Sequence, residues 1–186
     1  MARQGLTSER VTEVAAELAD RDGLTTLTLA RVAAVLDVRP PSLYNHVAGL
    51  DALRRAIALD ALAGIGTAMR EAATGRAGRD ALVHTARAYR AYVLAHPGRY
   101  AAASIAPPED DAALNAAATE VVGTMLAVLR AWDLDGDDAI HAVRAVRSAI
   151  HGFVTLEIDG GFGIPLDLDE SFDRMIAMLA GGFDAV

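Results

Sequence analysis

The chain has no cysteine and no lysine among its 186 residues, and it contains no long uninterrupted apolar run. Without cysteine, disulfides, thiolate metal sites and cysteine nucleophiles are excluded. Without lysine, every fixed positive charge is a guanidinium, which suits forked hydrogen bonding to phosphate or guanine. The first ten residues lack the apolar stretch of a signal peptide, and no run approaches the ~18 apolar residues that span a bilayer. We therefore expect a cytoplasmic protein with no membrane partner.

Negative charge is concentrated in the later part of the chain. The 17 basic and 25 acidic residues leave a net charge of −8, whereas proteins that bind nucleic acid are commonly basic. Residues 1–55 hold seven arginines and seven acids, so this segment is neutral, and residues 56–186 carry the whole excess. Since 53% of residues are hydrophobic, the chain is long and apolar enough to bury a core. The two parts are therefore expected to face different partners.

Helical periodicity marks three helices near the start of the chain. Apolar residues repeat with helical spacing over about 8–22, with Thr7 or Ser8 as the cap. Thr28 stands in the capping position of a second, short helix. Pro40 predicts the start of a third, because proline is tolerated only in the first helical turn. This helix is too short to be stable without its neighbours.

The remainder also reads as helical, with a long helix from about 51 to 74 and no strand-like alternation. We predict an all-α fold of about nine helices, with residues 1–50 as one domain and 51–186 as a second. The helix from about 139 to 158 has two apolar stripes, so both of its sides should be covered. With the last helix, about 168–183, it favours a subunit interface in a four-helix bundle. The alternative is a central core helix within one subunit.

Two short helices joined by a tight turn, after a supporting helix, form the helix-turn-helix arrangement, whose second helix lies in the DNA major groove. Tyr44 and His46 are placed to reach phosphate oxygens, while Leu43 anchors the inner face. Thr28 offers a hydroxyl at a helix N-terminus, where free amides favour an anion. Contacts of this kind set the register of the protein on DNA without reading the sequence.

Base reading is expected from the exposed start of the third helix and from one residue of the second. The candidates are Arg39, Pro40, Ser42, Asn45 and Arg31. Arg39 has the most specific potential, because a guanidinium can bind guanine in a bidentate manner. A plain phosphate contact by Arg39 remains an equal alternative.

The string LTLARVAAVLDVRPPSLYNHVAGLDAL, Leu27 to Leu53, resembles the DNA-binding domain of TetR-family transcriptional regulators. The resemblance implies a homodimer that binds a palindromic DNA operator, acts as a repressor and is released by a small-molecule effector. Arg39 stands where many members have serine or threonine, and Leu50 stands where a phosphate-binding lysine is usual. Arg54 or Arg55 can substitute for that lysine. Fewer phosphate contacts predict a shallow salt dependence.

Residues 139–183 resemble a C-terminal domain of this family known for a Trp, His and Gly motif. His151 and Gly152 fit the motif, whereas Arg147 stands where the tryptophan is usual. The helices that form the effector pocket in similar proteins carry Tyr89, Tyr92, Met125 and Trp132. Each of these is either a ligand contact or an ordinary core residue, and His151 is either a cavity residue or a hydrogen-bonded core group.

Other site chemistries lack their signatures. The five histidines include no i, i+4 pair, so a metal site is not expected. Asp133–Asp138 fails the calcium-loop pattern, since the sixth position is Asp138 and the twelfth is Arg144. With no dinucleotide fingerprint and no nucleophile elbow, we expect no cofactor and no enzyme activity.

Two alternatives to a DNA-binding regulator remain. One is an enzyme with a helical active site. The other is a helical interaction protein, or a small-molecule-binding protein, that does not bind specific DNA. For a regulator, the alanine-rich interior favours an apolar or planar effector.

Overall fold

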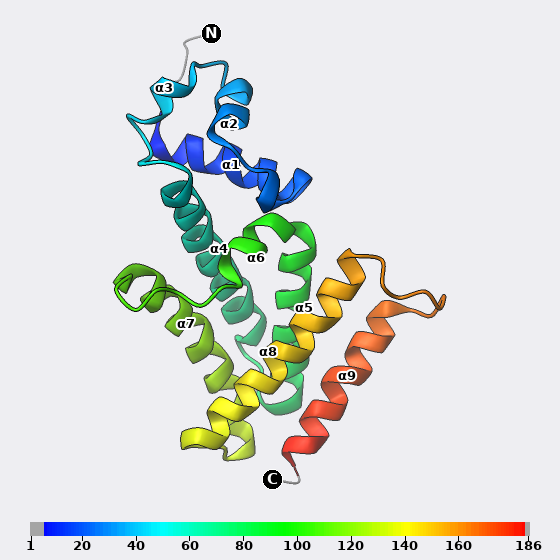
Figure 1. Cartoon of the computed structure of the whole chain (residues 1–186). Coiled ribbons are helices and arrows are strands. Elements are labelled where there is room, and N and C mark those ends of the chain that lie inside the picture. The colour runs from blue at the N-terminus through cyan, green and yellow to red at the C-terminus, as the bar shows by residue number, and fades with distance from the viewer. Residues whose placement is uncertain (1–5, 185–186) are drawn as a thin grey trace. The chain divides into compact units, whose positions relative to one another are not determined.

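The computed structural model describes residues 6–184, and every regular element within that range is helical (Figure 1). The predicted all-α class is confirmed, with nine α-helices and two short 3₁₀ helices in the described part. In chain order they are α1 (Ser8–Asp22), η1 (Leu24–Thr26), α2 (Leu29–Val35), α3 (Pro40–Leu43), α4 (Leu50–Ala73), α5 (Gly78–Ala95), α6 (Pro97–Ala103), α7 (Ala112–Leu129), η2 (Arg130–Trp132), α8 (Gly136–Ile158) and α9 (Leu168–Phe183).

Capping residues and proline set the boundaries of the first three helices. Thr7 Oγ1 accepts a hydrogen bond from the backbone N–H of Arg10 at 3.2 Å, and Thr28 Oγ1 accepts one from Arg31 at 3.3 Å. Pro40 lies in the first turn of α3, where its missing N–H costs no helical hydrogen bond. Because α3 is only four residues long, it depends on packing against neighbouring elements.

One apolar core holds α1, α2, α3 and the start of α4 together. Leu43, the last residue of α3, is fully buried in this core, as the sequence predicted. The buried members of the core are Val11, Val14, Ala15, Ala16, Leu18, Leu27, Val32, Ala33, Leu43, Leu53 and Ile57. Burial of one side of α3 leaves its other side to solvent.

The chain forms two compact units. The first contains residues 6–62 and 95–117, and the second contains 63–94 and 118–184. Within the first unit, α6 packs against α1 at Gly98 and Ala19. A Cβ atom at Gly98 would lie 2.1 Å from the carbonyl carbon and oxygen of Ala19, so only glycine permits this approach.

In the second unit, a buried arginine links three helices. Arg90 of α5 donates from Nε and Nη2 to Glu157 of α8 at 2.8 and 2.6 Å, and from Nη1 to Asp169 of α9 at 2.6 Å. Its guanidinium carbon also lies 5.5 and 5.0 Å from the ring centroids of Phe153 and Phe172. The hydrogen bonds to Glu157 in particular raise the pKa of Arg90 above its ordinary value, despite burial. This cluster fixes α8 and α9 against α5.

Helix α8 is apolar on one broad face and small or polar on the opposite one. Val146, Ile150 and Val154 are fully buried, whereas Ala145 and Gly152 are exposed. The second stripe predicted from the sequence is therefore only partly covered within this chain.

Helix α7 has an unusual composition for its exposure. The segment Ala112–Trp132 is long and apolar enough to cross a membrane by length and composition alone, although most of it is not buried in this chain. The expectation that no such segment exists was therefore wrong. Its hydropathy comes mainly from alanine, valine and leucine, and polar residues that include Thr119, Glu120 and Thr124 interrupt it.

Candidate nucleic-acid interface

A tight turn joins α2 to α3. Asp37 adopts a left-handed backbone conformation with φ of 54°, and the N–H of Val38 then donates to the carbonyl of Ala33 at 3.0 Å. This hydrogen bond closes the end of α2, as in the usual left-handed helix termination. The chain leaves the turn at Arg39, and α3 begins at the next residue. The geometry is that of a helix-turn-helix unit.

Helix α3 and the residues after it present polar side chains to solvent. Arg39, Pro40 and Asn45 are exposed, and 63% of Tyr44 is exposed. Ser42 and His46 are half-buried. The outward arrangement predicted from the sequence is thus confirmed, while contact of these side chains with DNA remains a prediction.

The residues after α3 are fixed to the start of α1. Ser8 Oγ donates to the carbonyl oxygen of His46 at 2.9 Å, and the N–H of His46 donates to the carbonyl of Leu43 at 2.8 Å. The backbone of His46 is therefore held from two elements, so Tyr44 and Asn45 project from a constrained segment. Such pre-organisation lowers the entropy cost of binding.

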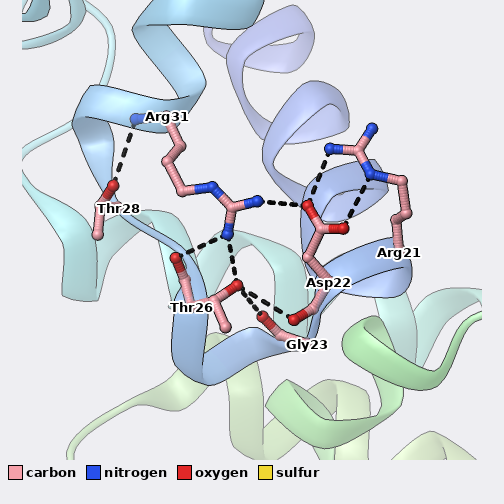
Figure 2. Close-up of polar contacts among 6 residues, drawn as sticks. All are labelled: Arg21, Asp22, Gly23, Thr26, Thr28 and Arg31. Carbon is pink, nitrogen blue, oxygen red and sulfur yellow. Dashed lines mark hydrogen bonds and ion pairs between the residues drawn. The ribbon is translucent and has the colours of Figure 1, made fainter.

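Arg31 hydrogen-bonds within the protein (Figure 2). Its guanidinium donates to the Asp22 carboxylate at the end of α1, and to the carbonyl and hydroxyl oxygens of Thr26. Arg21 binds the same carboxylate, with Nε–Oδ1 at 3.0 Å and Nη2–Oδ2 at 2.9 Å. The hydrogen bond from Arg21, followed by its charge and by the contacts of Arg31, lowers the pKa of Asp22 despite some desolvation. A base contact by Arg31 has to compete with these bonds.

The other basic residues of this region divide into paired and unpaired groups. Arg55 is held by Asp111, with Nη2–Oδ1 at 2.7 Å, and Arg54 lies 3.7 Å from Asp51. Arg10 and Arg39 make no side-chain ion pair or hydrogen bond anywhere in residues 6–184. These two guanidiniums therefore have no internal partner among the described residues that competes with an external anion.

Arg10 is a candidate that sequence reasoning missed. Arg10 of α1 and Arg39 at the start of α3 both line one hollow of about 1140 Å³, together with Ser8 and Ser42. Four carboxylates also line it, namely those of Glu9, Glu13, Asp37 and Asp60. No local pattern distinguishes Arg10 from the paired Arg21, because both have an acidic neighbour in the sequence and only the side-chain geometry shows that Arg21 binds Asp22.

The start of α4 carries no charge at the position where the resemblance led us to expect a phosphate contact. Leu50 is the first residue of α4 and packs against the N-terminal core. Arg55 is hydrogen-bonded to Asp111, so of the two arginines expected to replace the missing lysine, only Arg54 remains as a candidate phosphate contact.

The predicted effector residues lie in different environments. Tyr89 and Met125 are buried, and the Tyr92 ring lies so close to α4 that a Cβ at Gly64 would be 2.5 Å from it. Trp132 Nε1 donates to Asp184 Oδ1 at 2.7 Å. His151 is exposed on the side of α8 opposite the buried stripe, so it is not a core group.

No metal-binding constellation is present among residues 6–184: no group of three or more histidine, aspartate or glutamate side chains is placed to hold an ion.

Comparison with known proteins identifies relatives over nearly the whole chain. Residues 82–179 match the family model for the tetracycline-repressor-like C-terminal domain. An uncharacterised HTH-type transcriptional regulator of Mycobacterium tuberculosis is 39% identical over 96% of this chain and 82% of its own length. YobS of Bacillus subtilis, also an uncharacterised HTH-type transcriptional regulator, is 33% identical over 97% of this chain and 94% of its own.

Solved structures share the fold. BioQ of Mycobacterium smegmatis is 26% identical, with a TM-score of 0.72 over 97% of this chain and 99% of its own. BioQ has also been solved with its double-stranded DNA operator. These matches cover both the helix-turn-helix unit and the C-terminal helices. The chain therefore belongs to the TetR family of helix-turn-helix transcriptional regulators.

Proposed function

We propose that this DNA-binding regulator is a cytoplasmic, homodimeric repressor that leaves its operator when a small molecule binds. In this proposal residues 1–50 bind DNA, and residues 51–186 bind the effector and form the dimer. The observation that carries it is the solvent-exposed face at α3, where Tyr44, Asn45 and the unpaired Arg39 follow a tight turn. A short helix with this placement fits the major groove.

DNA contact is assigned to both ends of the helix-turn-helix unit. Arg39, with Pro40, Ser42 and Asn45, reads bases, while Tyr44 and His46 contact phosphate. Thr28 adds a phosphate contact at the start of α2. Arg31 adds a base contact, for which the base competes with the Asp22 carboxylate that binds Arg31 within the protein. In a dimer the two copies of α3 would occupy successive major grooves about 34 Å apart. The operator complex of BioQ, a protein of similar fold, supports this arrangement.

The exposed face of α8 and α9 supports dimerisation through the last two helices. Ala145 and Gly152 are exposed on α8, and 70% of Met178 is exposed on α9. Small side chains allow close helix approach, and burial of Met178 against a second copy would remove apolar surface from water. An isologous interface of this kind is the usual form of a C2 dimer.

Helix α4 connects the two functions along the chain, because it begins at Leu50 in the N-terminal core and continues into the second unit. The proposed effector contacts in that unit are Tyr89, Tyr92, Met125, Trp132 and His151. By linkage, an effector that weakens DNA binding is itself bound more weakly, by the same factor, when DNA is present.

The test is binding to the intergenic DNA beside the protein's own gene, measured by gel shift with unlabelled nonspecific DNA as competitor. We expect a retarded complex that survives a large excess of competitor. Loss of retardation at an equal mass of competitor would leave only electrostatic association and contradict the proposal.

A further inference from the structure

A small apolar pocket lies within the first unit, between α4, α6 and the segment that follows α6. Its volume is about 200 Å³. Ala58 and Leu62 of α4, Ala106 and Pro108 of the connecting segment, and Leu114 of α7 line it, and its polar lining comes from arginines of α4. We call this site the α4–α6 pocket.

The two arginines of the α4–α6 pocket are not equivalent. Arg55 is engaged by Asp111, to which its Nη2 donates at 2.7 Å. Arg54 has only a 3.7 Å ion pair with Asp51, whose side chain is 98% exposed. The Nε atom of Arg54 is buried and has no hydrogen-bond acceptor. Because that atom has almost no accessible surface, a ligand reaches the remainder of the guanidinium, whose side chain is 38% exposed.

The volume limits the size of the ligand. A dry apolar cavity of about 150 Å³ binds benzene, whereas pockets for drug-sized ligands begin near about 300 Å³. The α4–α6 pocket therefore admits one aromatic ring or a chain of roughly six to eight carbons. Apart from Arg54 and the Arg55 that Asp111 binds, its lining residues are apolar, so one anionic group on an apolar body is the best complement.

We propose that the α4–α6 pocket binds a small apolar monocarboxylic acid, with its carboxylate accepting hydrogen bonds from the exposed part of the Arg54 guanidinium and its apolar body against Ala58, Leu62 and Leu114. As an effector site, it rests on the proposed release of DNA by a small molecule and names the chemical class of that molecule. Arg54 lies one turn after Leu50, at which α4 joins the helix-turn-helix core. Occupancy of the pocket thus bears directly on the helix that supports the DNA-binding unit.

Binding is measured by titration calorimetry on the free protein, with sodium benzoate as the probe. Benzamide, a neutral molecule of the same shape, tests the charge, and sodium sulfate tests for binding of any anion. We expect benzoate to bind at least tenfold more tightly than benzamide, since hydrogen bonds between charged groups contribute roughly tenfold or more in affinity. Sulfate should not compete, because it has no apolar body.

Two variants and one control test whether the ligand binds in the pocket. Arg54→Gln should weaken benzoate binding roughly tenfold or more, whereas Arg70→Gln, at an exposed arginine outside the pocket, should leave it unchanged. Ala106→Phe fills the pocket from an exposed position and should abolish binding without unfolding the protein. Circular dichroism confirms that each variant is folded.

The proposal is overturned if benzoate does not bind, if benzamide or sulfate binds equally well, or if folded Ala106→Phe binds benzoate like the unmodified protein. Because no DNA is present, these results are separate from operator binding. A protein that binds benzoate through Arg54 but never retards DNA would contradict the proposed function and leave the site established.

Discussion

Arg99 of α6 binds the carboxylate of Asp20, near the end of α1, through two hydrogen bonds. Its backbone N–H donates to Oδ1 at 2.8 Å and its Nε donates to Oδ2 at 2.9 Å. The same guanidinium reaches Glu13 at 2.8 Å and Asp60 of α4 at 3.0 Å. Burial lowers the pKa of Arg99, but the hydrogen bonds and charges of Glu13 and Asp20 outweigh burial and raise it overall. One side chain thus joins α1, α4 and α6 in the first unit.

Replacing this arginine should destabilise the protein strongly. Arg99→Met leaves the carboxylate of Asp20, whose side chain is only 14% exposed, without its cation. Breaking such a pair by removing one partner costs about 3 kcal/mol of unfolding free energy. Urea denaturation measures it, with Arg174→Met as the control, because the exposed Arg174–Glu170 pair should contribute less than about 1 kcal/mol. Equal effects in the two variants would contradict the role given to Arg99.

A second stability test uses two glycines in different surroundings. Gly98→Ala places a Cβ 2.1 Å from backbone atoms of Ala19, so α6 has to move away from α1 at a cost of about 2 kcal/mol or more. Gly123→Ala, at a helical position with nothing within 4 Å, should instead stabilise by about 0.5–1 kcal/mol. Unfolding curves of both variants should therefore shift in opposite directions. A neutral Gly98→Ala would show that the α1–α6 contact is loose.

Acid should weaken the contacts of the Asp22 carboxylate with Arg21 and Arg31. The pKa of Asp22 is lowered in the folded protein, first by its hydrogen bond with Arg21 and also by Arg31. Its contribution to stability is therefore fully present above the unfolded-state pKa of about 3.9, and is lost as pH falls through the lower folded-state value. Asp22→Asn should lower the melting temperature near neutral pH, and its difference from the unmodified protein should shrink below about pH 4.

The control for this test is Asp159→Asn, at an exposed carboxylate without a side-chain ion pair in residues 6–184. Its melting temperature should follow that of the unmodified protein at every pH. A difference for Asp22→Asn that stays constant down to strong acid would contradict the assignment.

Operator binding should depend only weakly on salt, because Arg10 and Arg39 are the unpaired guanidiniums of the described N-terminal unit. Each phosphate contact contributes about 0.9 to the slope of log affinity against log salt concentration. Arg10→Ala in a dimer should therefore lower the magnitude of this slope by about 2. Fluorescence anisotropy at several salt concentrations measures it.

Arg130→Ala is a matched control for the salt experiment, because Arg130 is also an exposed arginine without an ion pair in the described chain but belongs to the second unit. Its slope should equal that of the unmodified protein. An equal loss in both variants would show that net charge, rather than contact by Arg10, determines the slope.

The sequence predicted the features that depend on local interactions. Thr28 as a helix cap, Pro40 as a helix start and Leu43 as the buried side of α3 each follow from propensity or periodicity, and the structure confirms their placement. The expected bounds of the last helix were also confirmed, at Leu168 and Phe183. Such features are set by residues within one or two turns of each other.

Features that depend on tertiary packing were not predicted. The pairing of Arg31 with Asp22 spans η1, and the α4–α6 pocket forms where the segment after α6 returns to α4. The free state of Arg10 was missed for the same reason, since it depends on which acids the fold brings near. For His151 the sequence left a cavity residue and a core group as alternatives, and its exposure on α8 removes the core alternative. Charge pairing across elements leaves no local pattern to read.

The central claim is that the exposed face at α3 reads DNA through Arg39. The most direct measurement compares affinity for the operator and for nonspecific DNA at one salt concentration, for the unmodified protein, Arg39→Ala and the α8 control Arg144→Ala. Arg39→Ala should lose about 1–3 kcal/mol of operator binding and much less of nonspecific binding, while Arg144→Ala should change neither. Equal losses on both DNAs would reduce Arg39 to a phosphate contact. An unchanged operator affinity in Arg39→Ala would contradict the claim.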